Sequence, residues 1–175
     1  MSKIALFFGP QGGSVDRVTN KLADIIGRDK AEVLPVLDAK ASDVEKFDKL
    51  IFVSSAIGLD QWDMADAKDD WDKFFPEIEK MNFEGKKIAL VGLGDHIKYP
   101  AHFVGSMGTL AEALIKNNAI LSGEVSVEGY EFEESEAINE KGLFYGLPID
   151  EDNEDHLTEE RLTKWVASIK SDFGI

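Results

Sequence analysis

Few residues in this 175-residue chain have the type and spacing for covalent chemistry. The chain has no cysteine, which excludes disulfides, thiol nucleophiles, thiolate-bound zinc and cysteine-held iron–sulfur clusters. The three histidines lack the i, i+4 spacing of a helical metal site, so we predict no metal. There is no Walker loop or nucleophile elbow, and Ser14 and Ser54 have no adjacent base. Redox chemistry would therefore need a bound organic cofactor or a different type of metal site.

Non-covalent binding has better candidates, in three polar segments that each follow a short apolar run. They are residues 10–15, 54–68 and 92–103. The first is rich in glycine and leads into an amphipathic stretch. Backbone amides in such a loop, together with the start of the helix that follows, make an anion site.

These segments need a scaffold that brings them together, and the rest of the chain supplies one. Short apolar runs at residues 4–8, 33–37, 50–53, 87–91 and 119–121 alternate with amphipathic stretches. This pattern predicts the α/β class, with a doubly wound, five-stranded parallel sheet and helices on both faces. Ligands bind such sheets beyond the carboxyl ends of the strands, where the strand order reverses. The three polar segments follow the first, third and fourth strands.

The remaining details complete a single domain over residues 1–175. Pro35 indicates an edge position for the second strand or a local bulge in it. Ser42 and Glu45 fit a capping box at the start of a short helix, and Thr158 fits the N-cap of the last helix. Residues 123–148 interrupt the alternation with β-like pieces at 124–127 and 142–145, after which residues 147–149 resume the fifth strand. Trp71 and Trp165 belong to apolar helix faces and are expected in the core.

The charge of the chain limits its partners. It carries 34 acidic and 19 basic residues, a formal net charge of −15. Such a surface repels nucleic acid and anionic membranes and favours partner proteins with basic docking faces. The N-terminus lacks the pattern of a signal peptide, so we expect a cytoplasmic protein. We also expect a monomer.

Long segments in the second half of the chain resemble the long-chain flavodoxins. They read GLGDHIKYPAHF over 92–103, EGYEF over 128–132 followed by Ser135, GLPIDEDN over 146–153 and TEER over 158–161. The resemblance covers essentially the whole chain. It implies a flavodoxin-like fold, noncovalently bound FMN, and transfer of single electrons at low potential between redox enzymes. Residues 123–148 would be the long-chain insertion, which is associated with partner contact.

The resemblance also implies a set of cofactor-binding residues. In the first segment these are Pro10, Gln11, Gly12, Gly13, Ser14 and Val15, around the phosphate. This segment departs from the family pattern: Pro10 has no N–H, and only Gln11 and Ser14 carry a side-chain donor. In the second segment they are Ser54, Ser55, Ala56, Ile57 and Gly58, with Ile57, Leu59 or Trp62 covering one flavin face. In the third they are Gly92, Leu93, Gly94, Asp95, Tyr99, His102 and Phe103, together with Asp152 further on.

Individual roles follow from this assignment. Tyr99 would stack on the isoalloxazine ring, while Asp95 and residues 150–152 would place negative charge near it. That charge would lower the potential of the second reduction. His102 has two readings, a group that makes the potential depend on pH or an exposed residue at a helix start. His96 and His156 are expected at the surface.

Two other functions compete with the electron carrier, which is not itself an enzyme. The altered phosphate loop would suit a flavodoxin-fold interaction or regulatory protein with weak or lost FMN binding. An FMN-dependent quinone or nitro reductase would need a substrate pocket over the flavin and usually an oligomer, and no sequence feature requires either.

Overall fold

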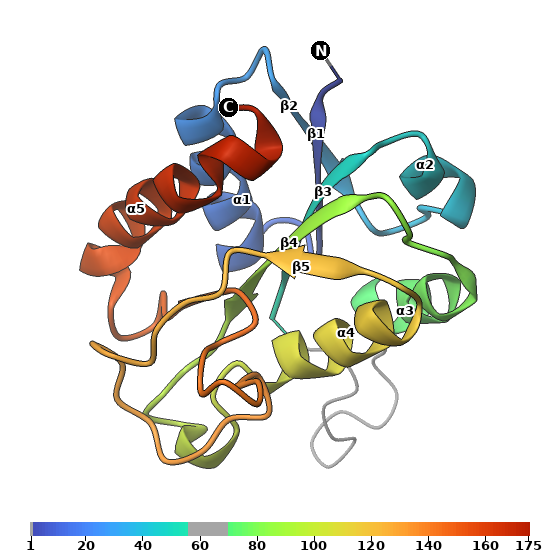
Figure 1. Cartoon of the computed structure of the whole chain (residues 1–175). Coiled ribbons are helices and arrows are strands. Elements are labelled where there is room, and N and C mark those ends of the chain that lie inside the picture. Colours follow the sequence, from blue (N-terminus) through green and yellow to red (C-terminus); the bar gives the residue numbers. More distant parts are fainter. Residues whose placement is uncertain (1, 56–69) are drawn as a thin grey trace.

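The computed structural model describes residues 2–55 and 70–175 of the chain. Strands and helices alternate along it (Figure 1). The elements are β1 (Ile4–Phe8), α1 (Ser14–Ile26), β2 (Ala31–Pro35), α2 (Ala41–Glu45), β3 (Lys49–Ser54), α3 (Asp70–Lys80), β4 (Lys87–Leu93), α4 (Gly105–Lys116), β5 (Ile120–Ser122), β6 (Leu147–Ile149) and α5 (Asp155–Phe173). A 3-10 turn over Pro100–His102 precedes α4.

The strands form one parallel sheet in the order β2-β1-β3-β4-β5, with β6 also paired to β4. β5 pairs with the first half of β4 and β6 with its last three residues, so the two share the fifth position of the sheet. The predicted parallel, doubly wound sheet is confirmed, as are the resumption of the fifth strand and the edge position of the second. The order reverses between β1 and β3, which is where such folds bind ligands.

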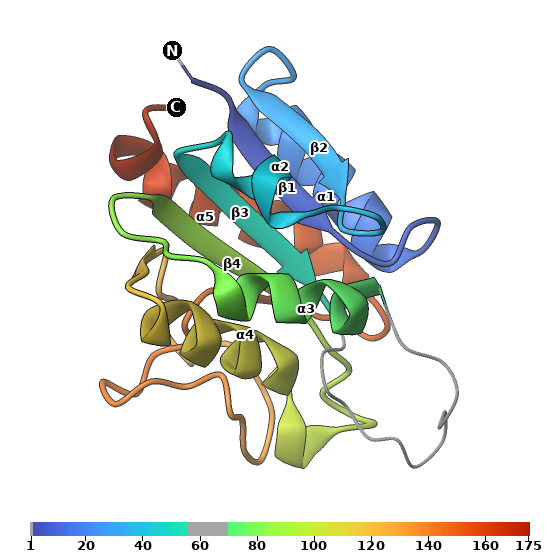
Figure 2. The same ribbon diagram turned by 90° about the vertical axis from the view of Figure 1, so that its right-hand side faces the viewer.

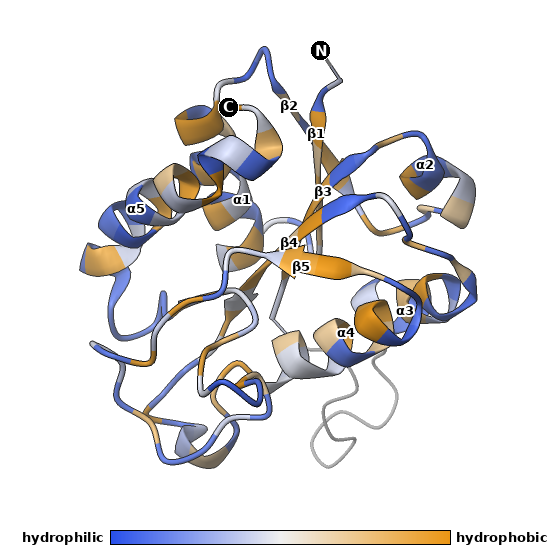
Figure 3. Ribbon diagram, in the orientation of Figure 1, coloured by the Kyte–Doolittle hydropathy of each residue, from blue (hydrophilic) through white to orange (hydrophobic). Residues whose placement is uncertain are grey.

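Helices cover both faces of the sheet because each central strand buries side chains on both sides. In β1, Ile4, Leu6 and Phe8 pack under α1 and α5, while Ala5 and Phe7 face α3 and the other helices of the opposite layer. This two-sided burial produces the continuous apolar runs of the sequence. Figure 3 shows the same division, with the strands hydrophobic and the helices mixed. Among the described residues, no helix combines the length and apolarity needed to span a bilayer.

Residues 123–148 pack against α4 and the loop before it (Figure 1). A Cβ atom on Gly108 of α4 would lie 2.2 Å from the backbone oxygen of Glu136, so only glycine permits this approach. The predicted β-like pieces at 124–127 and 142–145 each contain one β-bridge residue, and the two pieces pair with each other there. Phe144 makes isolated antiparallel bridges to Val125 and Ile138, and the segment is held by buried aromatic rings and not by a ladder.

Two predicted N-cap assignments are wrong, because each side chain lies inside its helix. In α2 the carboxylate of Asp43 accepts the N–H of Lys40 at 2.9 Å, which places Ser42 inside the helix and not at its cap. α5 begins at Asp155, so Thr158 lies in its first turn. The Thr158 hydroxyl donates to Glu151 Oε2 at 2.6 Å instead.

Candidate functional site

The carboxyl ends of β1, β3 and β4 place the predicted segments along one edge of the sheet (Figure 2). The register fixes their neighbours: Phe8 pairs with Val53, and Ser54 pairs with Gly92. The loop after β1, the residues after β3 and the loop after β4 therefore meet at the point where the strand order reverses. Ala56, Ile57, Gly58, Leu59 and Trp62 lie outside the described residues.

The first loop presents backbone to solvent at the start of α1. Pro10, Gln11 and Gly12 are exposed, and Gly13 is the N-cap residue without a side-chain cap. Gly12 has φ +85°, a left-handed conformation that favours glycine. The Val15 side chain is only 2% exposed, so this residue can offer a ligand its backbone alone. Amides in the first turn of a helix lack intrahelical partners, so the start of α1 is suited to an anion.

Ser54, the last residue of β3, carries an unusual hydroxyl. The residue is 1% exposed, and among the described residues its Oγ has no hydrogen-bond partner. Leaving a buried hydroxyl unpaired costs about 1–3 kcal/mol. Ser54 lies between the loop after β1 and Gly92 at the end of β4, so a polar ligand at this edge would pair with its hydroxyl only after displacing the atoms that cover it. This observation fits the phosphate or ribityl part of a flavin nucleotide.

The glycines of the third segment are constrained by packing. A Cβ on Gly92 would lie 2.9 Å from the Cβ of Met107, and one on Gly94 would lie 2.9 Å from the Val104 nitrogen. Both glycines therefore let α4 and its preceding loop approach the end of β4. Leu93 is buried at 5% exposure, so it too can meet a ligand only through its backbone.

Tyr99 is presented at the surface by a loop with a fixed backbone. The Asp95 carboxylate accepts the N–H groups of Ile97 at 3.0 Å and Lys98 at 2.8 Å. These bonds, the Lys98 one foremost, hold the pKa of Asp95 below its ordinary value against a smaller opposing effect of burial. The Tyr99 side chain remains 51% exposed, with Lys98 Nζ 5.4 Å from the ring centroid. An exposed aromatic ring on a fixed loop can stack on a planar ligand.

The prediction that His96 lies at the surface is wrong, because its ring is bonded to a buried carboxylate. Its side chain is 13% exposed, and its Nδ1 donates to Asp150 Oδ2 at 2.5 Å. Asp150, at 0% exposure, also accepts the His96 backbone N–H at 3.0 Å and the side-chain amide of Asn153. Burial opposes ionisation of Asp150, but these hydrogen bonds outweigh it and lower its pKa. The pair ties the loop after β4 to the end of β6.

The other predicted residues of this segment divide between surface and core. His102 is exposed and pairs with Glu136, and His156 is exposed as predicted. The Phe103 side chain, at 1% exposure, packs among the rings of Tyr130 and Phe144, so it supports the loop from behind and presents no surface to a ligand.

Asp152 lies beside this network and is exposed. Partial burial and then the negative charges of Asp95 and Asp150 raise its pKa. Its backbone N–H donates to Asp150 Oδ1 at 3.1 Å. The structure thus gathers Asp95, Asp150 and Asp152 where the loop after β4 meets the end of β6.

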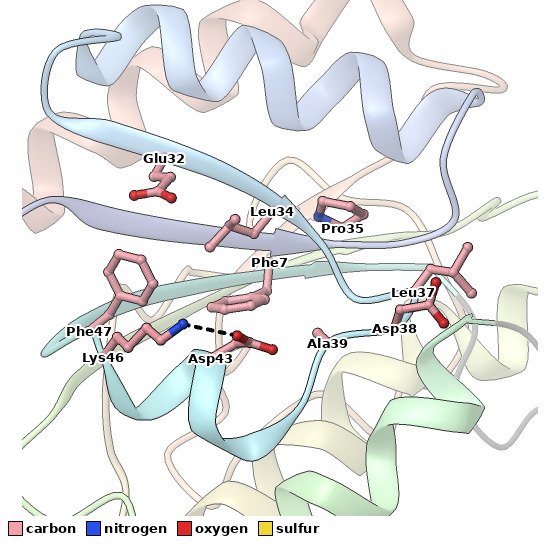
Figure 4. Close-up of a pocket in the computed structure, with 10 residues that line it drawn as sticks. All are labelled: Phe7, Glu32, Leu34, Pro35, Leu37, Asp38, Ala39, Asp43, Lys46 and Phe47. Atoms are coloured by element: carbon pink, nitrogen blue, oxygen red, sulfur yellow. Dashed lines mark hydrogen bonds and ion pairs between the residues drawn. The ribbon is translucent and has the colours of Figure 1, made fainter.

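Two other features were tested as sites. His96, Asp150 and Glu154 have ligand atoms within 4.8 Å of one another, but Nδ1 of His96 is bonded to Asp150 and Glu154 pairs with Arg161 at 3.2 Å. The cluster is thus compensated internally without a cation. A hollow of about 260 Å³ lies between β2 and α2, on the far side of β1 from β4 (Figure 4). Phe7 and Phe47 line it beside the Lys46–Asp43 pair, and none of the predicted site residues does.

Fold and site together define a doubly wound α/β protein whose candidate site lies at the topological switch point of its sheet. The family model described as flavodoxin matches residues 6–165. A flavodoxin of Synechococcus elongatus is 35% identical over 176 residues, covering all of both chains, and Flavodoxin 1 of Escherichia coli K12 is 33% identical over 175 residues, covering 100% of this chain and 97% of that one. A crystal structure of Fusobacterium nucleatum flavodoxin bound to flavin mononucleotide superposes with a TM-score of 0.87, at 26% identity and 99% coverage of both chains. The chain belongs to the flavodoxin family.

Proposed function

We propose that this chain binds FMN noncovalently and carries single electrons between redox enzymes. The observation that carries the proposal is the buried hydroxyl of Ser54, unpaired among the described residues, at the end of β3 beside Gly92 of β4. In a member of the flavodoxin family, this is the edge where a flavin nucleotide is expected. FMN supplies the redox chemistry, because its ring system takes up and releases electrons one at a time.

Different residues of the chain bind different parts of FMN. The amides from Gln11 to Val15, with the side chains of Gln11 and Ser14, bind the phosphate, and Ser54 donates to the adjoining part of the ligand. Tyr99 stacks on the isoalloxazine, and the backbone around Gly94 contacts the edge of the ring. These assignments rest on the exposure of the first loop and of Tyr99, and on the position of Ser54.

The charges around the crevice favour a low potential. Asp95 keeps its charge because backbone N–H groups stabilise the carboxylate, and Asp150 because its hydrogen bonds outweigh burial. Negative charge beside the ring opposes the further negative charge that reduction brings, most strongly where water is excluded. We therefore infer that the second electron is accepted only at low potential.

The partners are redox proteins with basic docking faces. A net charge of −15 steers a basic partner into weak, rapidly exchanging encounters. The same charge disfavours nucleic acid and anionic membranes. We infer a cytoplasmic monomer of long-chain type that is an electron carrier and not an enzyme. The flavodoxin assignment favours this carrier over an interaction module that has lost FMN.

The test is an FMN titration of the apoprotein, followed by the absorbance and fluorescence of the flavin. We expect one FMN per chain and a yellow complex that accepts electrons in two separate steps. Ser54→Ala should weaken FMN binding about tenfold, from the loss of one hydrogen bond to a polar ligand.

A matched control is Ser168→Ala, whose hydroxyl donates to the Trp165 backbone oxygen on α5, remote from the crevice. Its FMN affinity should equal that of the parent chain. A colourless protein that ignores added FMN would refute the proposal. Turnover of a quinone with NADH by the isolated protein would instead establish a reductase.

A further inference from the structure

The carboxylate of Asp16 is bonded into the first loop, at the place proposed for the phosphate. Its Oδ2 accepts the backbone N–H of Gly12 at 2.9 Å, and its Oδ1 accepts the side-chain amide of Asn20 at 2.7 Å. The Asn20 oxygen in turn accepts a hydrogen bond from Arg28 Nη2 at 3.0 Å. This chain of hydrogen bonds along α1 orients the carboxylate toward the loop.

The position of Asp16 has two opposing consequences. A negative side chain in the first turn of a helix is stabilised by the helix dipole and by unpaired amides. The same side chain engages one N–H of a loop in which Pro10 has none to offer. It also adds a negative charge where a phosphate would place its own.

We propose that Asp16 is an internal competitor of the FMN phosphate at the Gly12 amide, and that it sets how strongly the protein prefers FMN over riboflavin. The inference rests on the proposed function, since it assumes that the crevice binds a flavin. Phosphate carries about −1.5 to −2 charges at pH 7, whereas riboflavin has no phosphate. Asp16 therefore weakens FMN binding and leaves riboflavin binding unaffected.

A purely structural role makes the opposite prediction. If the Asp16–Gly12 bond serves to hold the loop in its binding shape, its loss disorders the loop and weakens FMN binding. Two substitutions separate these roles. Asp16→Asn removes the charge and keeps an oxygen that can accept from Gly12. Asp16→Ala removes both charge and bond and leaves the amide to the ligand.

The experiment measures the dissociation constants of FMN and riboflavin for the apoprotein by fluorescence and calorimetry, at low and at moderate ionic strength. In Asp16→Asn we expect the ratio of the riboflavin to the FMN constant to rise about tenfold at low salt, from removal of a like charge close to the phosphate. The rise should shrink as salt screens the repulsion. Asp16→Ala should raise the ratio at least as much, and riboflavin affinity should change less than about twofold in both variants.

The matched control is Asp172→Asn, which changes the net charge equally from an exposed position near the C-terminal end of α5. Asp172 is not part of the Asp16–Asn20–Arg28 chain of hydrogen bonds, and its substitution should leave the ratio unchanged. Urea unfolding of each apoprotein shows that the variants are folded at the titration temperature.

The outcomes separate the inference from the proposed function. A parent chain that binds both flavins, together with an unchanged or lowered ratio in Asp16→Asn and Asp16→Ala, overturns the role of Asp16 and leaves the electron carrier intact. A rise in Asp172→Asn equal to that in Asp16→Asn also overturns it, because net charge alone would then explain the effect. A parent chain that binds neither flavin refutes the proposed function itself.

Discussion

Asp150→Asn should destabilise the apoprotein severely, although it replaces a side chain by one of the same shape. Asp150 is fully buried, and its two oxygens accept hydrogen bonds from the His96 backbone and ring and from Asn153, among others. All of these partners are donors. A carboxylate satisfies them in any orientation because both of its oxygens accept.

The expected magnitude follows from the number of donors on each oxygen. Oδ2 of Asp150 accepts hydrogen bonds from the backbone N–H and from the ring Nδ1–H of His96. Oδ1 of Asp150 accepts hydrogen bonds from the backbone N–H groups of Asp152 and Asn153. Whichever way an asparagine amide turns, its nitrogen faces at least two of these donors. At about 1–3 kcal/mol for each of two buried donors left unpaired, the loss is about 2–6 kcal/mol. That is a large part of a typical unfolding free energy of about 5–15 kcal/mol.

The assay is urea unfolding of the parent chain and the variant between pH 7 and pH 3. Burial raises the pKa of Asp150, but hydrogen bonds to Asn153 and His96 overcome burial and leave it lowered in the folded state. The stability contributed by the ionised group is therefore complete above the unfolded pKa of about 3.9, and it is lost as the pH falls through the lower folded pKa. The difference between the two proteins should be largest near pH 7 and should narrow below about pH 4.

Asp155→Asn is the control, because Asp155 is exposed in the first turn of α5 and has only the helix dipole to lose. Its substitution should cost less than about 1 kcal/mol. If Asp150→Asn were as stable as this control at pH 7, the buried network would not contribute as argued. A difference that stayed constant down to pH 3 would refute the assignment of the effect to the charge.

Three further changes test other contacts. Gly108→Ala should lower the unfolding free energy by about 1–3 kcal/mol in urea, since its Cβ would collide with the Glu136 backbone, whereas glycine to alanine in an unobstructed helix would raise it. Burial raises the pKa of Tyr130 to about 12 despite the nearby Arg161. A phenolate absorbance step should therefore appear near that pH in the parent chain and be missing in Tyr130→Phe. Because the unfolded tyrosine ionises near pH 10, the unfolding free energy should fall as the pH rises above about 10. Burial and neighbouring carboxylates raise the pKa of Asp152, so Asp152→Asn should keep or slightly raise stability at pH 7, within about 0.5 kcal/mol, and a loss above that would refute the repulsion.

The sheet and its crevice could be predicted because local pattern and topology agree. Central strands that bury both faces leave apolar runs that alternate with helices, and a parallel order then brings the ends of β1, β3 and β4 together. The glycine loop before Ser14 and the loop around Tyr99 were predicted on this basis, and the structure places both at the same edge.

Contacts between distant residues could not be predicted in the same way. His96 and its partner Asp150 are 54 residues apart, and nothing in the sequence around either one indicates the pair. The start of α2 was mispredicted for a local reason: Ser42 and Glu45 fit the capping pattern, whereas the bond that forms joins Asp43 to the backbone of Lys40, a residue type that does not indicate an N-cap. The bond from Gly12 to Asp16 spans four residues, but an acidic residue in a first helical turn is too common to indicate it.

Two polar groups at the carboxyl edge of the sheet differ in whether they have a hydrogen-bond partner. Ser54 has a buried hydroxyl that no described residue pairs, whereas the Gly12 amide already has a partner in Asp16. A flavin nucleotide that pairs with the Ser54 hydroxyl must also displace the Asp16 carboxylate from the Gly12 amide or bind beside it. Ligand binding stabilises a fold by an amount that grows with the ratio of ligand concentration to dissociation constant. Riboflavin can pair with the Ser54 hydroxyl but has no phosphate for Asp16 to repel. At equal concentration, the difference between the stabilisation by FMN and that by riboflavin therefore measures the effect of Asp16 on phosphate binding.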